Sequence, residues 1–174
     1  MTGSAPMKKD RYMDLSSDFK LGMRRLASGV SIVATTDEQG PKGFLATSVS
    51  SVALEPWPCL LVCVNKSTSS HDAFIRTQVF SVNVLAERQV DIARRFSSPE
   101  LRDARFEGGA WEVLETGAPI NRDALASFDC RLMTTMTVQT HTVLVGRAVA
   151  VRSADTAAEP LIYYDGCFDR GRAA

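Results

Sequence analysis

Two clusters of small hydroxyl residues lie close together in the first half of the sequence. One runs from Thr47 to Ser51 and the other from Ser67 to Ser70, with the apolar run Cys59–Val64 between them. Hydroxyl and main-chain N–H groups at two such places suit a ligand with one planar, hydrogen-bonding end and one anionic end. Flavin mononucleotide (FMN) has that form. Taken alone, the first cluster is better explained by hydroxyls that satisfy their own backbone.

The second cluster follows a predicted strand and precedes a predicted helix that starts at Ser70. Hydroxyls and free N–H groups at a helix start favour a phosphate, and Lys66 adds positive charge. An ordinary helix cap at Ser69 or Ser70 is an alternative that uses the same N–H groups. The predicted phosphate-binding residues are Asn65, Lys66, Ser67, Thr68 and Ser69.

A predicted helix over residues 87–96 carries three further candidates. Arg95 extends the predicted phosphate site, whereas Arg94 is better interpreted as a solvated surface residue. Phe96 either packs on the ligand's ring or ribose or belongs to the core, and both interpretations remain open.

His141 follows a polar turn and begins a strongly apolar strand, so we expect it at the rim of the fold. A histidine there can orient a substrate or handle a proton. A hydrogen-bonded residue at a strand end is the alternative. His71 fits the beginning of a helix, and we assign no chemistry to it.

Strands outnumber helices in this sequence, and short turns connect them. Strands are predicted over residues 30–36, 42–46, 49–54, 58–64, 80–85, 111–114, 124–138, 142–152, 160–164 and 167–168, and helices over 19–28, 70–76 and 87–96. Residues 97–109 are expected to form a loop. The pattern predicts a mostly antiparallel β-barrel with a few helices attached. A doubly wound parallel sheet is disfavoured, because no Gly-x-Gly-x-x-Gly motif follows any strand.

Composition limits the classes of partner. The chain has 174 residues, 45% hydrophobic and 23% charged, with no formal net charge. These values predict one globular domain, over residues 16–174, and no attraction to nucleic acid or to an anionic membrane. No apolar run reaches the ~20 residues that span a bilayer. The polar segment Met1–Met13 predicts a disordered leader over residues 1–15 and a cytoplasmic protein.

The chain has four cysteines, Cys59, Cys63, Cys130 and Cys167, and no Cys-x-x-Cys motif. With two histidines, it offers poor material for a zinc site, and we predict no metal. We expect buried, reduced thiols that pack as small apolar groups.

The order of these features resembles the flavin reductase family built on the FMN-binding split barrel, the reductase components of two-component flavin-dependent monooxygenases. The matching pieces are Phe19-x-x-x-Met23-x-x-Leu26-x-Ser28-Gly29-Val30, Ile32–Thr36, Gly43-x-x-Ala46-Thr47-Ser48, Val62–Ser69, Phe80–Leu85, Ala93–Phe96, His141, Gly146, Pro160–Tyr164, Gly166 and Phe168. The chain departs from the family pattern at Gln139–Thr140, where Gly-Asp is usual, at Trp57 between two prolines, and at Ala53 in place of a frequent serine.

The resemblance implies a mostly β, antiparallel Greek-key split barrel with a few flanking helices. It implies that Ala46, Thr47, Ser48 and Ser51 line the flavin ring, and that His141 lies near the nicotinamide. FMN would be the flavin, with FAD as the alternative, and NADH or NADPH the hydride donor.

It also implies a homodimer and a partner monooxygenase. Two alternatives stay open: a reductase that passes electrons to a cob(II)alamin-type corrinoid, and a non-catalytic flavin or haem binder, with His141 as the haem ligand.

Overall fold

The computed structural model describes residues 9–108, 110–154 and 157–170. Its helices are α1 (Lys9–Arg24), α2 (His71–Thr77), the 3₁₀ turn η1 (Glu87–Gln89) and α3 (Val90–Ser97). Its strands are β1 (Ser28–Gly29), β2 (Ser31–Asp37), β3 (Gly40–Ala46), β4 (Ser50–Ala53), β5 (Cys59–Asn65), β6 (Val79–Val84), β7 (Trp111–Val113), β8 (Pro119–Asn121), β9 (Ala126–Val138), β10 (His141–Ser153), β11 (Leu161–Tyr164) and β12 (Cys167–Arg170).

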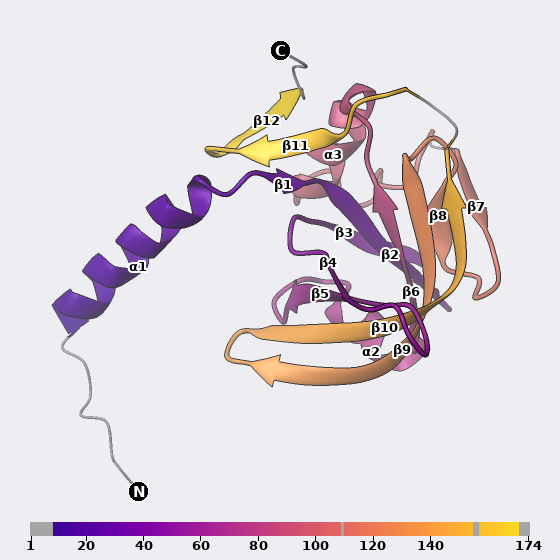
Figure 1. Cartoon of the computed structure of the whole chain (residues 1–174), viewed down its shortest axis with the longest axis horizontal. Helices are drawn as coiled ribbons and strands as arrows, with labels where there is room; N and C mark the ends of the chain where they lie inside the picture. The colour runs from indigo at the N-terminus through magenta and orange to yellow at the C-terminus, as the bar shows by residue number, and fades with distance from the viewer. Residues whose placement is uncertain (1–8, 109, 155–156, 171–174) are drawn as a thin grey trace, which may run out of the picture.

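One large antiparallel sheet dominates the fold (Figure 1). Its strand order is β3-β2-β6-β9-β10-β5-β4, and two smaller sheets, β1-β11-β12 and β7-β8, flank it. The sheet curls so that β3, at one edge, approaches β5, next to the other edge. The predicted mostly antiparallel β fold is confirmed.

Strand β2 is buried on both faces and joins two cores. Val33 packs in one core with Phe44, Phe74 and Phe80 inside the curled sheet. Ile32 and Ala34 pack in the other core, beneath α3 and the C-terminal hairpin. Such two-sided burial matches the β-branched run that predicted this strand.

Helix α1 differs from the prediction. It begins at Lys9 and ends at Arg24, whereas a helix over 19–28 and a disordered leader over 1–15 were expected. Residues 9–15 are therefore helical, and residues 1–8 lie outside the described residues. The helix ends early because the chain turns at Arg25 and Leu26, whose N–H groups donate to Gly22 and Met23, before it enters β1.

The cysteines were only partly predicted. All four thiols are free, and Cys130 alone is buried. Burial raises its pKa to about 12, so this thiol is inert. Cys59 and Cys63 are half-buried, because β5 turns Leu60, Val62 and Val64 toward the core instead. Cys167 is exposed.

Among the described residues, no helix combines the length and apolar character needed to cross a membrane.

Gly146 tests the packing inside the sheet. It lies at a β-bulge of β10, and an added Cβ would meet the buried ring of Phe80 at 2.5 Å. We expect Gly146→Ala to lower the free energy of unfolding by about 1–3 kcal/mol, measured by urea denaturation, because the ring has no room to move away. Gly22→Ala, where nothing lies within 4 Å, is the matched control and should be neutral or slightly stabilising. A Gly146→Ala variant as stable as wild type would contradict this packing.

Candidate functional site

Two parts of the predicted site, the 65–69 turn and His141, meet where β5 ends. Strands β5 and β10 pair antiparallel, and Asn65 lies opposite His141 in their register. The N–H of Lys66 donates to the carbonyl of Thr140 at 2.9 Å, which ties the two turns together. His141 is exposed at the start of β10, as predicted, and its Nδ1 lies 3.0 Å from Thr140 Oγ1.

The first hydroxyl cluster reaches the same strand. Beyond the end of β3, Ser48 Oγ accepts from the N–H of Cys63 at 3.3 Å and lies 3.5 Å from the carbonyl of Cys63. Thr47 and Ser48 are exposed. Ala46 is buried in the core, so it can offer a ligand its main chain only.

The second cluster forms a tight turn before α2. Asn65 Oδ1 accepts from the N–H and the hydroxyl of Ser67, at 3.0 and 2.9 Å. The N–H of Thr68 donates to the carbonyl of Asn65 at 2.9 Å. Ser70 occupies the N-cap position of α2 but makes no side-chain cap hydrogen bond. The capping alternative for this hydroxyl is therefore not what the structure shows.

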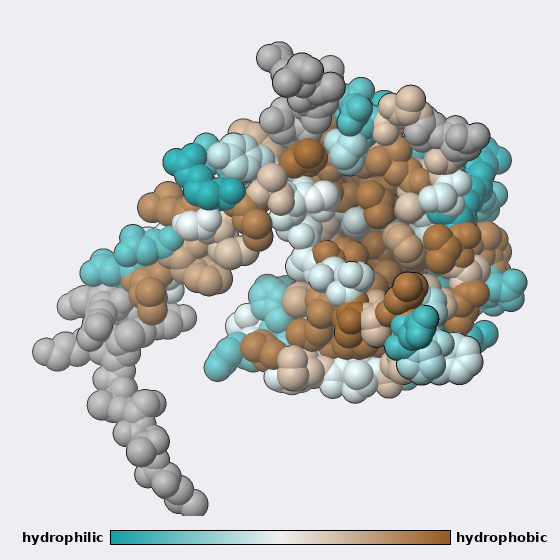
Figure 2. Space-filling view, in the orientation of Figure 1, coloured by the Kyte–Doolittle hydropathy of each residue, from teal (hydrophilic) through white to brown (hydrophobic). Residues whose placement is uncertain are grey.

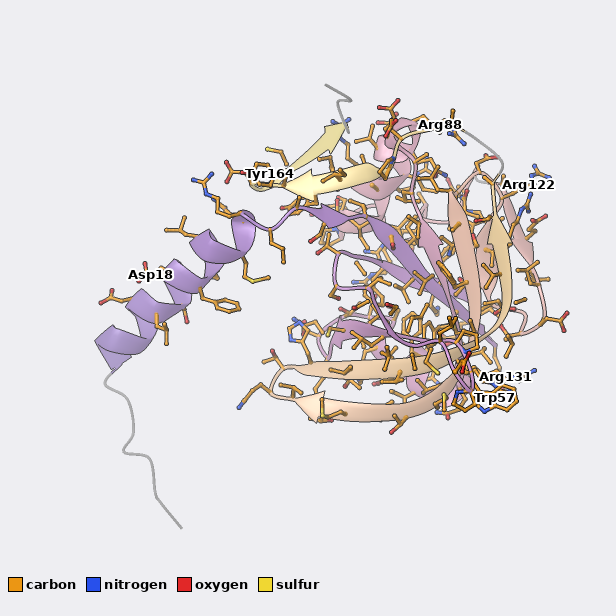
Figure 3. The ribbon with its side chains drawn as sticks, in the orientation of Figure 1. Asp18, Trp57, Arg88, Arg122, Arg131 and Tyr164 are labelled. Carbon is orange, nitrogen blue, oxygen red and sulfur yellow. The ribbon has the colours of Figure 1, made fainter. Side chains whose placement is uncertain are left out.

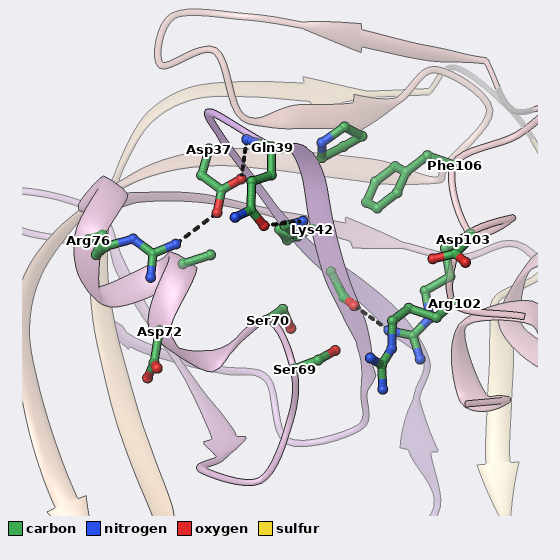
Figure 4. A pocket seen from close by; sticks show the side chains of 14 residues that line it. Asp37, Gln39, Lys42, Ser69, Ser70, Asp72, Arg76, Arg102, Asp103 and Phe106 are labelled. Carbon is green, nitrogen blue, oxygen red and sulfur yellow. Dashed lines mark hydrogen bonds and ion pairs between the residues drawn. The ribbon is translucent and has the colours of Figure 1, made fainter. Parts of the chain in front are cut away.

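A cavity of about 570 Å³ opens behind this turn (Figure 4). It lies between the first half of β3, the turn before α2 and the 102–106 segment. Its lining residues are Asp37, Gln39, Pro41, Lys42, Gly43, Ser69, Ser70, Asp72, Ala73, Arg76, Arg102, Asp103, Arg105 and Phe106. Charged side chains from separate elements thus meet around a site that includes Ser69, one of the predicted phosphate residues.

A second cavity, also of about 570 Å³, borders the other end of β3. It is lined by Leu45, Thr47, Arg94, Ser97, Tyr163, Gly166, Cys167 and Phe168. An extended chain from Lys42 to Thr47 spans roughly 17 Å. The two cavities therefore lie toward opposite ends of one strand and within about this length of each other, which a ligand with two polar ends could span.

Ser51 lies apart from these residues. It borders a third cavity of about 510 Å³, whose other lining residues are almost all apolar. Thr68 and Asn65 are half-buried in their turn, and Lys66 and Ser67 are exposed. The structure thus brings His141, Ser48 and the 65–69 turn together at the end of β5 and leaves Ser51 on the β4 edge.

Two predicted ligand contacts are occupied by the protein itself. Arg95 Nη1 donates to the carbonyls of Ala104 and Glu107, so this guanidinium holds the 98–108 segment. Phe96 is 2% exposed and packs on Phe106 and Trp111. The core interpretation of Phe96 is correct, and its ring has almost no surface left for a ligand.

Of the two neighbouring arginines, Arg94 is exposed and pairs with Asp91 at 3.3 Å, as expected of a surface residue. It also borders the cavity beside Thr47, which the sequence did not predict. Sequence analysis also missed Lys42, Arg102 and Arg105. Arg102 and Arg105 lie in the polar segment 97–109, which carries no periodic pattern. The positive charge of these two arginines is the one signal in that segment that could have pointed to a site.

His71 has a structural role. Its Nε2 lies 2.9 Å from Thr142 Oγ1 on β10, and its Nδ1 lies 2.8 Å from Asp72 Oδ1. The contact with Thr142 ties α2 to the strand that begins with His141.

Comparisons with known proteins cover most of the chain. The family model described as "Flavin reductase like domain" matches residues 23–172. The chain is 40% identical to the FMN reductase (NADH) RutF of Bradyrhizobium diazoefficiens over 143 residues, covering 82% of this chain and 79% of that protein. It is 41% identical to the RutF of Variovorax paradoxus over 149 residues, covering 86% and 82%.

Two solved structures are similar throughout. Nitrilotriacetate monooxygenase component B from Mycobacterium thermoresistibile superposes with a TM-score of 0.84 at 29% identity, covering 91% of this chain and 87% of that one. BorF, the flavin reductase component of a bacterial two-component tryptophan halogenase, superposes with a TM-score of 0.81 at 31% identity, covering 88% of this chain and 96% of that one.

The neighbouring arginines give a stability test. Arg95→Gln should lower the free energy of unfolding by about 1–2 kcal/mol, because it removes charge-assisted hydrogen bonds to main-chain carbonyls. It should also speed proteolysis within residues 98–108. Arg94→Gln, whose partner Asp91 is exposed, should change stability by less than about 0.5 kcal/mol. Equal effects of the two substitutions in urea denaturation would contradict the assignment.

Proposed function

The chain belongs to the flavin reductase like domain family, and from that premise we propose that it reduces a flavin with NADH and releases the reduced flavin to a separate oxygenase. A flavin bound here accepts a hydride from C4 of the nicotinamide at its N5 position. FMN is the flavin named for the curated relatives, and FAD is the alternative.

The observation that carries this proposal is the meeting of His141, Ser48 and the 65–69 turn at the end of β5. Hydroxyls and main-chain N–H groups are the donors that a flavin ring and its phosphate require. This reaction needs no side-chain nucleophile. It needs two rings held in contact, and such positioning alone can supply several kcal/mol.

We assign the residues by their position on the structure. The main chain at Ala46 and the exposed Thr47 and Ser48 contact the edge of the ring. The phosphate-binding residues are Asn65, Lys66, Ser67, Thr68 and Ser69. His141, exposed at the rim opposite Asn65, orients the nicotinamide.

We propose NADH over NADPH as the donor, because the curated relatives are named as NADH-dependent enzymes. An oxygenase partner is supported by BorF and by nitrilotriacetate monooxygenase component B, which are named as components of two-component systems or oxygenases. None of the relatives described above is named as a corrinoid reductase or a haem protein.

We propose that the protein is a homodimer. Helix α1 extends away from the body (Figure 1), and apolar side chains lie along it and over the facing side of the molecule (Figure 2). Leu15, Phe19, Met23 and Leu26 recur at helical spacing and are each about half exposed or more. A stripe of this kind in water favours a partner surface, and a second copy is the simplest one.

A cytoplasmic location completes the proposal. The four cysteines are free thiols, which suits a reducing compartment.

The reductase assignment is tested by mixing the protein with FMN and NADH without oxygen. The flavin absorption band should bleach within seconds at catalytic protein concentrations. Absence of bleaching above the protein-free rate, with NADH and with NADPH, would remove the proposal.

His141→Gln should lower kcat/KM for NADH by about tenfold, because the nicotinamide ring loses the side chain that orients it. The FMN Kd and the melting temperature should stay unchanged, since the side chain is exposed. His71→Gln is the matched control and should show the opposite pattern, with lower stability and a kcat/KM near wild type for the folded fraction. An unchanged kcat/KM in His141→Gln would exclude His141 from the site.

The dimer is tested by light scattering, which should give twice the 19.0 kDa of one chain. Phe19→Glu should shift the mass toward one chain, because it places a charge in the apolar stripe. Ser17→Glu adds the same charge to the opposite side of α1 and should leave the dimer intact. A wild-type mass of one chain would refute this part of the proposal.

A further inference from the structure

The cavity behind the 65–70 turn carries more positive charge than its own carboxylates neutralise. Lys42, Arg76, Arg102 and Arg105 line it together with three aspartates. Within the described residues, only Arg76 forms an ion pair there, to Asp37 at 2.9 Å.

The aspartates leave the other cations unpaired. Asp37 is bonded to Arg76 and to the N–H of Gln39, and Asp72 pairs with His71. Asp103 forms no ion pair in the part of the chain that the structure describes, and it lies beside Arg102 at the edge of the cavity (Figure 4).

Two guanidinium groups, those of Arg102 and Arg105, lie near each other on one wall of the cavity. Arg105 Nη1 donates to the carbonyl of Gly43 at 3.0 Å, which fixes this side chain against β3. Burial lowers the pKa of Arg105, and the positive charge of Arg102 lowers it further. A half-buried guanidinium beside a second positive charge is unfavourable, and an anion bound next to both groups would offset this cost.

Two polar atoms of the lining have no protein partner. Ser70 is 2% exposed, and its Oγ is buried with no hydrogen bond. Arg105 Nε is also buried and unbonded. A buried donor without a partner costs about 1–3 kcal/mol. Two of them beside one cavity indicate a ligand that supplies acceptors.

We infer that this cavity binds a phosphate group of a nucleotide substrate, held by Arg102, Arg105 and Lys42 together with the hydroxyl of Ser70. The inference rests on the proposed function and extends its phosphate site from the 65–69 turn to Ser70 and to three cations that lie outside the hydroxyl clusters. Arginine forks match phosphate oxygens bidentately, and Lys42 adds a point charge from β3. Ser69 lies in the same cavity, so the flavin phosphate is the first source of this group, and the phosphates of NADH are the second.

The test compares FMN with riboflavin, which lacks the phosphate, by fluorescence titration of the wild-type protein and its variants. Arg102→Gln should raise the FMN Kd about tenfold, which is about 1.4 kcal/mol, and leave the riboflavin Kd unchanged. Ser70→Ala should raise the FMN Kd about fivefold without lowering the melting temperature, because it removes a hydroxyl that the protein leaves unbonded. Added salt should weaken the binding of FMN and leave the binding of riboflavin unchanged.

Arg122→Gln is the matched control. Arg122 is an exposed arginine beyond β8 and outside the cavity lining (Figure 3), so neither Kd should change. If Arg102→Gln and Ser70→Ala instead raise KM for NADH and leave both flavin Kd values unchanged, the inference holds with the donor as the source of the phosphate.

Two results would overturn the inference. Unchanged FMN Kd and NADH KM in both variants, in a wild-type protein that still reduces FMN, would reject the phosphate site alone. A wild-type protein that binds and reduces neither flavin would reject the proposed function and this inference with it.

Discussion

The pairing of β5 with β10 is the constraint on which the site depends. Its register sets Asn65 opposite His141, and a slip of β5 by one residue would turn the side chain of Asn65 to the other face of the sheet. Leu60, Val62 and Val64 hold the register from the buried side of β5, and Leu144 does so from β10. The rim residues can be exposed and polar because the strands behind them are anchored in the core.

This arrangement explains how a chain without an evident nucleophile can support redox chemistry. The hydrogen-bonding groups around the end of β5 are hydroxyls, main-chain amides, the Asn65 carboxamide, the Lys66 ammonium and the His141 imidazole. Groups of this kind position two rings and stabilise charge without forming covalent bonds to either. The charged cavity at one end of β3 and the second cavity at the other end, beside Thr47, give a two-ended ligand a place for each end.

Local pattern was sufficient where burial dictates the residue type. Alternating and β-branched runs predicted β2, β5, β6 and β10, and the polar turn before His141 predicted its position at the rim. The sequence pattern was insufficient for side chains whose position depends on tertiary contacts. Arg94 and Arg95 are adjacent and alike in sequence, but Arg94 borders a cavity formed with the C-terminal hairpin, whereas Arg95 donates to carbonyls of the 98–108 segment. The full extent of α1 was missed because the polar segment Met1–Met13 was interpreted as the start of a disordered leader, although Leu15 lies four residues before Phe19 and belongs to the same apolar stripe.

The central claim is that main-chain amides and hydroxyls near the end of β5 hold the flavin. Hydrogen–deuterium exchange of the full chain, with and without saturating FMN, measures those amides directly. The account predicts slower exchange in residues 46–48 and 66–70 and unchanged exchange in the β7–β8 hairpin. Protection confined to the β4 edge, or no protection in either segment, would contradict it.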